Sequence, residues 1–74
     1  MEKANLRMTK FYRGLDNYKA ISIAEGFDGE EHTQTEELCA WQFIADKGLW
    51  KGLQGWFGRT VESLIEQGLI RKSK

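Results

Sequence analysis

Proline is absent from this 74-residue sequence, and cysteine and histidine occur once each. A disulfide within one chain is excluded, because Cys39 has no second cysteine to pair with. A zinc site of cysteine and histidine side chains is nearly excluded as well, because such sites usually take four ligands and only Cys39 and His32 are available. We therefore expect no metal and no other cofactor.

Long apolar runs are also missing. No stretch approaches the roughly 18 residues of a membrane span, and the N-terminal residues MEKANLRMTK lack the apolar core of a signal peptide. We expect a cytoplasmic protein without membrane contact. A chain of this length forms one domain, and small domains often add disulfides, metals or a second subunit to a limited core. By elimination, self-association gains weight, and we expect a homodimer.

The net charge is zero, but the charges are segregated along the chain. Residues 1–19 carry a net charge of +3 and residues 47–74 carry +4, whereas residues 20–46 carry −7 and no basic side chain. The ends can fold back on the acidic middle, two chains can dock head to tail, or the acidic surface can meet a basic partner. A solvated acidic face is the plainest interpretation. The acidic surface is expected at Glu30, Glu31, Glu36 and Glu37.

The clearest predicted helix covers residues 33–47. Thr33 and Glu36 have the spacing of a capping box, and Gly48 follows the last turn as a residue able to adopt a left-handed conformation. The apolar stripe of this helix is formed by Leu38, Trp41, Ile44 and Ala45, with Phe43 beside it.

Two shorter helices are predicted on either side of it. The first begins at Asp16, ends near Gly26 and carries Leu15, Tyr18 and Ile21 on one face. The last covers about residues 59–67, starts at Gly58 or Thr60 and stops at Gly68. Residues 1–14 fit either a short strand or an extended arm, and residues 71–74 are expected to fray.

These elements predict a small all-α bundle of about three helices within a single domain covering residues 1–74. Between the last two helices lies GLWKGLQGWFG, residues 48–58, in which glycines alternate with large aromatic and aliphatic side chains. We expect one short helical turn near residues 49–53 and then a tight glycine-supported loop.

The aromatic side chains of this block have two interpretations. They can simply be core, since apolar side chains are buried by default. They are also too many for one short turn to bury, and tryptophan and arginine are enriched at interface hot spots. The predicted partner-binding surface consists of Trp50, Gln54, Trp56, Phe57 and Arg59. Arg59 would clamp a carboxylate or cap carbonyls, and Gln54 is expected mainly to satisfy backbone groups.

Catalysis finds little support, and we expect a protein that is not an enzyme. The glycine spacing fits neither a phosphate-binding loop nor a dinucleotide-binding turn. A metal site from Glu30, His32 and Glu36 is imaginable, but a solvated acidic loop at a helix start is the favoured interpretation.

The alternative function is nucleic-acid binding through a helix-turn-helix-like arrangement, with Arg59 and Thr60 at a helix start. Against it, Glu62 and Glu66 would face a polyanion, and the connection is far longer than the usual turn of about 3–4 residues.

Residues 40–70 contain AWQFIADKGL, then LQG, then an aromatic residue before GRT, then LIEQGLI. This pattern resembles a family of very short bacteriophage proteins of uncharacterised function, with a looser match in KAISIAEGF. Such proteins favour a small residue after GRT, where this chain has Val61. The resemblance implies a phage source and no known activity. Together with the small size and the lack of a membrane span, it leads us to expect a phage accessory protein in the host cell cytoplasm. Our hypothesis is a protein-binding module that antagonises a host or defence protein.

Overall fold

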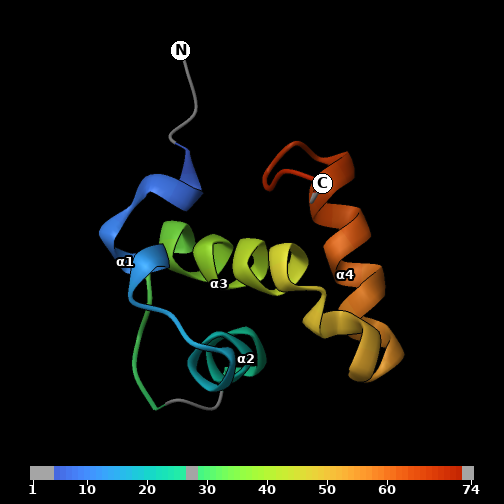
Figure 1. The fold of residues 1–74 in the computed structure, drawn as a ribbon, viewed down its shortest axis with the longest axis horizontal. Coiled ribbons are helices and arrows are strands. Elements are labelled where there is room, and N and C mark those ends of the chain that lie inside the picture. Colours follow the sequence, from blue (N-terminus) through green and yellow to red (C-terminus); the bar gives the residue numbers. More distant parts are fainter. Residues whose placement is uncertain (1–4, 27–28, 73–74) are drawn as a thin grey trace.

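The computed structural model describes residues 5–26 and 29–72 (Figure 1). Within these ranges the chain forms helices and no strand, which confirms the predicted all-α class. The elements in chain order are the 3₁₀ turn η1 (Leu6–Met8), α1 (Lys10–Arg13), α2 (Asn17–Glu25), α3 (Gln34–Lys47), the 3₁₀ turn η2 (Leu49–Gly52) and α4 (Gly55–Glu66).

Helix α3 begins and ends as predicted. The Thr33 hydroxyl accepts a hydrogen bond from the backbone N–H of Glu36, and the Glu36 carboxylate accepts one from the backbone N–H of Thr33. At the other end Gly48 adopts a left-handed conformation, with φ of 65°. These two groups satisfy backbone donors and acceptors that a helix end would otherwise leave unpaired.

Helix α3 is also the centre of the fold. It crosses the middle of the molecule, with α2 beneath it and seen end-on, the N-terminal segment at one end and α4 beyond the other (Figure 1). Because neighbours cover it from several sides, every residue from 39 to 45 is buried. The predicted apolar stripe was therefore too narrow: Cys39, Ala40 and Gln42 are buried as well, while Leu38 is half-buried.

Helix α2 packs on α3 through small and aliphatic side chains. Asp16 caps its first turn by accepting the N–H of Lys19, as predicted. Its buried residues are Ala20 and Ile23. Of the predicted apolar face, Leu15 is buried and Ile21 is half-buried against the core, whereas Tyr18 is 82 % exposed, so the prediction was wrong for Tyr18. A fully buried alanine allows the two helix axes to approach closely, and this contact sets the orientation of α2.

The N-terminal segment is helical. Thr9 accepts the N–H of Tyr12 and thereby starts α1, in place of the predicted short strand or extended arm. Residues 1–4 of that predicted arm lie outside the described residues.

Helix α4 begins earlier than predicted. Its first residue is Gly55 and not a residue near Thr60, so Trp56 and Phe57 lie in the first turn of a helix. The short helical turn predicted before it is present as η2. The error came from treating Gly55 and Gly58 as loop residues because of the low helix propensity of glycine.

The end of α4 has the hydrogen bonds of a Schellman motif. Gly68 has a φ of 76°, and the N–H of Leu69 donates to the carbonyl of Leu64 over 3.0 Å. Ile70 then folds back and is buried, with 3 % of its surface exposed. The chain therefore returns toward α3 after the last helix. Among the described helices, none is both long and apolar enough to cross a membrane.

We predict that Gly48→Ala lowers the free energy of unfolding by about 1 kcal/mol, because a Cβ is strained at this positive φ. Gly52→Ala is the matched control, since a Cβ at this position would meet no atom within 4 Å and the φ of Gly52 is not positive. Urea unfolding followed by circular dichroism measures both, and equal destabilisation by the two substitutions would contradict this account of the helix end.

Candidate partner-binding pocket

The aromatic residues predicted as one surface are divided by the structure. Phe57 is a core residue with 2 % of its surface exposed. Trp56 is half-buried, stacks on Phe57 with ring centroids 4.0 Å apart, and meets Trp41 edge-on at 6.0 Å. Both rings therefore help to join α4 to α3.

Trp50 lies elsewhere, on η2, and its ring rests on the backbone of α4. A Cβ at Gly58 would stand 3.2 Å from Cε3 of Trp50. Such a distance is too short for an ordinary contact, so glycine at this position lets the indole approach the helix. This close approach accounts for a glycine in the interior of α4, where its propensity is unfavourable by about 1 kcal/mol.

Gln54 and Arg59 are both exposed. Gln54 precedes α4 as its N-cap, but its side chain makes no capping hydrogen bond. The guanidinium of Arg59 lies back over the first turn, where Nη1 would be 3.4 Å from a Cβ at Gly55. Of the predicted partner-binding residues, these two are the most open to solvent.

A pocket of about 510 Å³ lies between the C-terminal end of α3, η2, α4 and the C-terminal tail. Trp50 lines it, and of the five residues predicted as the partner-binding surface it is the one that does so. The small or apolar residues of the lining are Ala45, Gly48, Trp50, Gly58, Val61 and Ile65. Its charged residues are Asp46, Lys47, Lys51, Glu62 and Lys72.

The charges at the pocket are mainly basic. Lys47, Lys51 and Lys72 come from α3, η2 and the tail, and all three are exposed. Their position at the end of α3 also complements the helix dipole. Glu62 opposes them, whereas Asp46 is neutralised by Arg7. The pocket therefore combines an apolar lining with an excess of positive charge.

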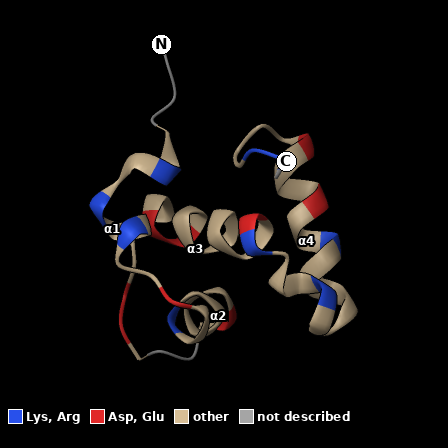
Figure 2. Cartoon of the chain, in the orientation of Figure 1, with Lys and Arg blue, Asp and Glu red and all other residues tan. Residues whose placement is uncertain are grey.

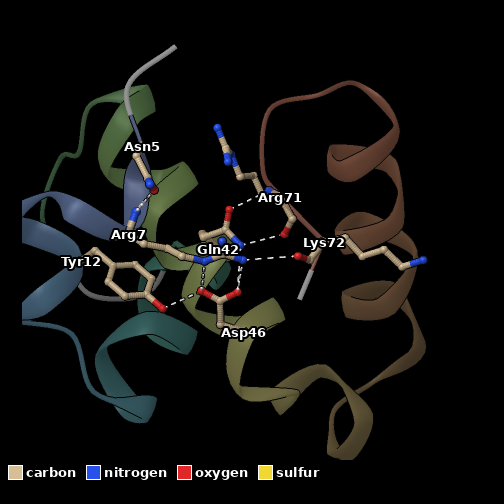
Figure 3. A network of polar contacts seen from close by, with 7 residues as sticks. All are labelled: Asn5, Arg7, Tyr12, Gln42, Asp46, Arg71 and Lys72. Carbon is tan, nitrogen blue, oxygen red and sulfur yellow. Dashed lines mark hydrogen bonds and ion pairs between the residues drawn. The ribbon is translucent and has the colours of Figure 1, made fainter. Parts of the chain in front are cut away.

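Lys72 lines the pocket from the C-terminal tail, the residues that follow Ile70. The tail is held by a network of polar contacts around Asp46 (Figure 3). Arg7 donates two hydrogen bonds of 2.7 Å to the Asp46 carboxylate, one from Nε and one from Nη2. The hydroxyl of Tyr12 donates a third over 2.6 Å, and the side-chain amide of Gln42 a fourth over 3.1 Å. A bidentate, charge-assisted pair of this kind is among the stronger polar interactions in proteins.

Gln42 extends the network to the tail. Its side chain is almost completely buried, and it forms two hydrogen bonds with the backbone of Arg71: it donates to the carbonyl over 2.8 Å and accepts the N–H over 2.7 Å. Arg7 adds a longer contact of 3.4 Å to the carbonyl of Lys72. Residues 71 and 72, predicted to fray, are thus bound to α3, while residues 73–74 lie outside the described residues.

The network changes the acidity of its members. Burial alone would raise the pKa of Asp46, but the hydrogen bonds from Arg7 and Tyr12 outweigh it, and the pKa lies below its usual value. The hydrogen bond to Asp46 raises the pKa of Arg7. Burial, together with the same carboxylate, raises the pKa of Tyr12 to about 12. Asp46 and Arg7 are therefore charged, and Tyr12 is neutral, at physiological pH.

The predicted acidic surface lies at the opposite end of α3 from the pocket (Figure 2). Glu30, Glu31 and Glu37 are exposed, whereas Glu36 is half-buried and occupied by the capping box and by a contact of 3.2 Å with His32. In residues 5–26 and 29–72, no three acidic, histidine or cysteine side chains form a group suited to a metal ion.

Sequence reasoning did not select the three lysines of the pocket. The available signal was Lys51 directly after Trp50, and its ammonium lies 5.8 Å from the centroid of that ring, whereas the ammonium of Lys47 lies 5.6 Å from the ring centroid of Phe43. Lys72 gave no such signal, because its position depends on the contact between Gln42 and the tail.

Comparison of the chain with protein-family models, with curated proteins and with solved structures finds no match. The resemblance of residues 40–70 to short phage proteins therefore stays a prediction from the sequence.

We predict that Phe57→Ala removes most of the helical circular dichroism signal, because truncating a buried phenylalanine costs about 3–5 kcal/mol and the domain is small. Arg59→Ala, two positions further along α4, is the control and should change the free energy of unfolding by less than about 0.5 kcal/mol. A Phe57→Ala protein as stable as the parent would show that this ring is not part of the core.

We predict that Asp46→Asn destabilises the protein by about 2 kcal/mol near neutral pH, the usual worth of hydrogen bonds to a charged group. Because the pKa of Asp46 is lowered by folding, its contribution is present above the unfolded pKa of about 3.9 and is lost as pH falls through the folded pKa.

The difference between parent and Asp46→Asn should therefore shrink below about pH 4, which urea unfolding at several pH values measures. Asp16→Asn is the control, because asparagine caps a helix as well as aspartate does. A difference that stays constant down to the lowest pH would contradict the role given to the charge of Asp46.

Proposed function

We propose that the protein is a non-enzymatic protein-binding module, and that its pocket takes an acidic segment of a partner protein. The observation that supports this proposal is the rim of three exposed lysines around a lining that contains Trp50 and small apolar residues. The lysines come from three separate elements and meet at one place. Such a site attracts carboxylates at its edge and buries an apolar side chain at its centre.

The shape of the lining favours a side chain of the partner against Trp50. Gly48 and Ala45 contribute little bulk to the lining, whereas Gly58 lies directly against the indole. Tryptophan is one of the residue types that dominate interface energetics, and a half-buried indole loses little conformational freedom on binding. Ammonium groups on flexible stems do not demand one carboxylate geometry, so the proposal names a class of segment, acidic with one apolar residue.

Nucleic acid is the competing class of ligand, because lysines attract phosphates too. Helix α4 starts at Gly55, which places Arg59 and Thr60 in its second turn and not at the free amides of its N-terminus. This feature favours a protein segment over a nucleic-acid backbone.

The resemblance to short phage proteins supports a biological setting for this binding. We propose that the protein acts in the host cell cytoplasm, where it binds and blocks a host protein such as a defence protein, and this part of the proposal does not assign that host protein to the pocket. This part of the proposal rests on residues 40–70 alone.

The test uses a short acetylated and amidated peptide with one leucine between runs of glutamate, and a second peptide with lysine in place of glutamate. Binding is followed through the fluorescence anisotropy of a dye attached to each peptide. We predict that the acidic peptide binds and the basic one does not, and that Lys51→Glu or Trp50→Ala weakens binding about tenfold. Lys10→Glu, at an exposed position of α1, is the matched charge control and should have no effect on peptide binding.

Equal binding of both peptides, or no effect of Lys51→Glu, would contradict the proposal. Binding of duplex DNA that weakens steeply with salt, without binding of the acidic peptide, would favour nucleic acid as the ligand.

A further inference from the structure

We propose that the acidic segment taken by the pocket belongs to a second copy of this chain, so that two copies form an antiparallel dimer in which each pocket holds the partner's residues 30–37. The inference rests on the pocket function proposed above and names its occupant. We call residues 30–37 the acidic segment; its four glutamates are Glu30, Glu31, Glu36 and Glu37.

Charge complementarity is the first argument. Residues 20–46 contain no lysine and no arginine. The sequence around the acidic segment therefore supplies no ammonium or guanidinium group to neutralise its carboxylates. Glu31 and Glu37 are exposed. Glu36 is occupied by the capping box, so Glu31 and Glu37 are the carboxylates best placed for the pocket of another molecule.

The second argument is the distance between the two surfaces within one chain. The acidic segment leads into the first turn of α3, whereas the pocket lies at the last turn (Figure 2). A helix of 14 residues is about 21 Å long, so a chain cannot place its own acidic segment in its own pocket. The complementary surfaces can meet only between molecules.

The third argument is closure. In the proposed dimer the two α3 helices run antiparallel about a two-fold axis and each acidic segment occupies the other pocket, so that both contacts form at once. A head-to-tail stack would leave one pocket and one acidic segment unused at its ends and would continue growing. The dimer uses every contact and stops at two copies. It also adds buried surface to a domain of only 74 residues, whose own core is small.

The experiment is sedimentation equilibrium at low and at high salt, with charge-reversal variants of the full chain. The parent should be a dimer at low salt that weakens as salt is added. Lys51→Glu alone should raise the dissociation constant about tenfold, because it puts like charges into both symmetric contacts, and so should Glu31→Lys with Glu37→Lys.

An equimolar mixture of these two variants should recover the dimer. In the mixed pair one contact is native and the other pairs Lys51→Glu with Glu31→Lys and Glu37→Lys, so the mixture should bind more tightly than either variant alone. Lys10→Glu and Glu66→Lys, both exposed and outside the two surfaces, are the controls and should leave the parent mass unchanged. Circular dichroism checks that each variant keeps its helices, since Glu37→Lys places a cation in the first turn of α3.

A monomeric parent would overturn the dimer. If that monomer still binds the glutamate peptide through Lys51, the pocket function stands and only its occupant is another protein. If the parent neither dimerises nor binds the peptide, both proposals fail. A dimer whose mass ignores the reversals, or a mixture that stays monomeric while each variant is folded, would also overturn this arrangement.

Discussion

The side chains of Gln42 and Asp46 hold the N-terminal segment around Arg7 and the C-terminal segment around Arg71 against α3. The packing of both segments on α3 depends on these contacts. Asp46 binds Arg7 and Tyr12 from the N-terminal segment, and Gln42 binds the backbone of Arg71 in the tail (Figure 3). The two side chains lie one turn apart on α3. Without them the tail would lose its only polar contacts to α3 among the described residues, and Lys72 would no longer wall the pocket.

The second constraint is the approach of Trp50 to the backbone of α4. The indole lies where a Cβ at Gly58 would stand 3.2 Å away, so a larger residue there would displace the indole by a few tenths of an ångström. Helix α4 accepts two poor helix-forming residues in its first turns because Phe57 and Trp56 pack on Trp41 there. Tertiary packing thus overrides local propensity, as it does for most helices in proteins. The same contact leaves Trp50 at the pocket and keeps Phe57 in the core.

The features that could be predicted from the sequence are those with a local cause. The capping box of Thr33 and Glu36, the cap at Asp16, the left-handed Gly48 and the stop at Gly68 depend on residues a few positions apart. The pocket could not be predicted, because it requires the tail to meet α3 through a buried glutamine 29 positions away. Tyr18 was misplaced for a related reason: α2 completely buries Ala20, a small residue with little hydrophobic signal.

The most direct test of the account is the hydrogen-exchange rate of the Arg71 backbone amide in the intact protein. This N–H donates to the Gln42 side chain over 2.7 Å and lies near the end of the chain, where an unbound amide exchanges freely. We predict protection close to that of the central α3 amides, because opening this contact requires the buried Gln42 to lose its partner. Exchange at the rate of an unstructured peptide would show that the tail is not held, and would contradict the pocket as described.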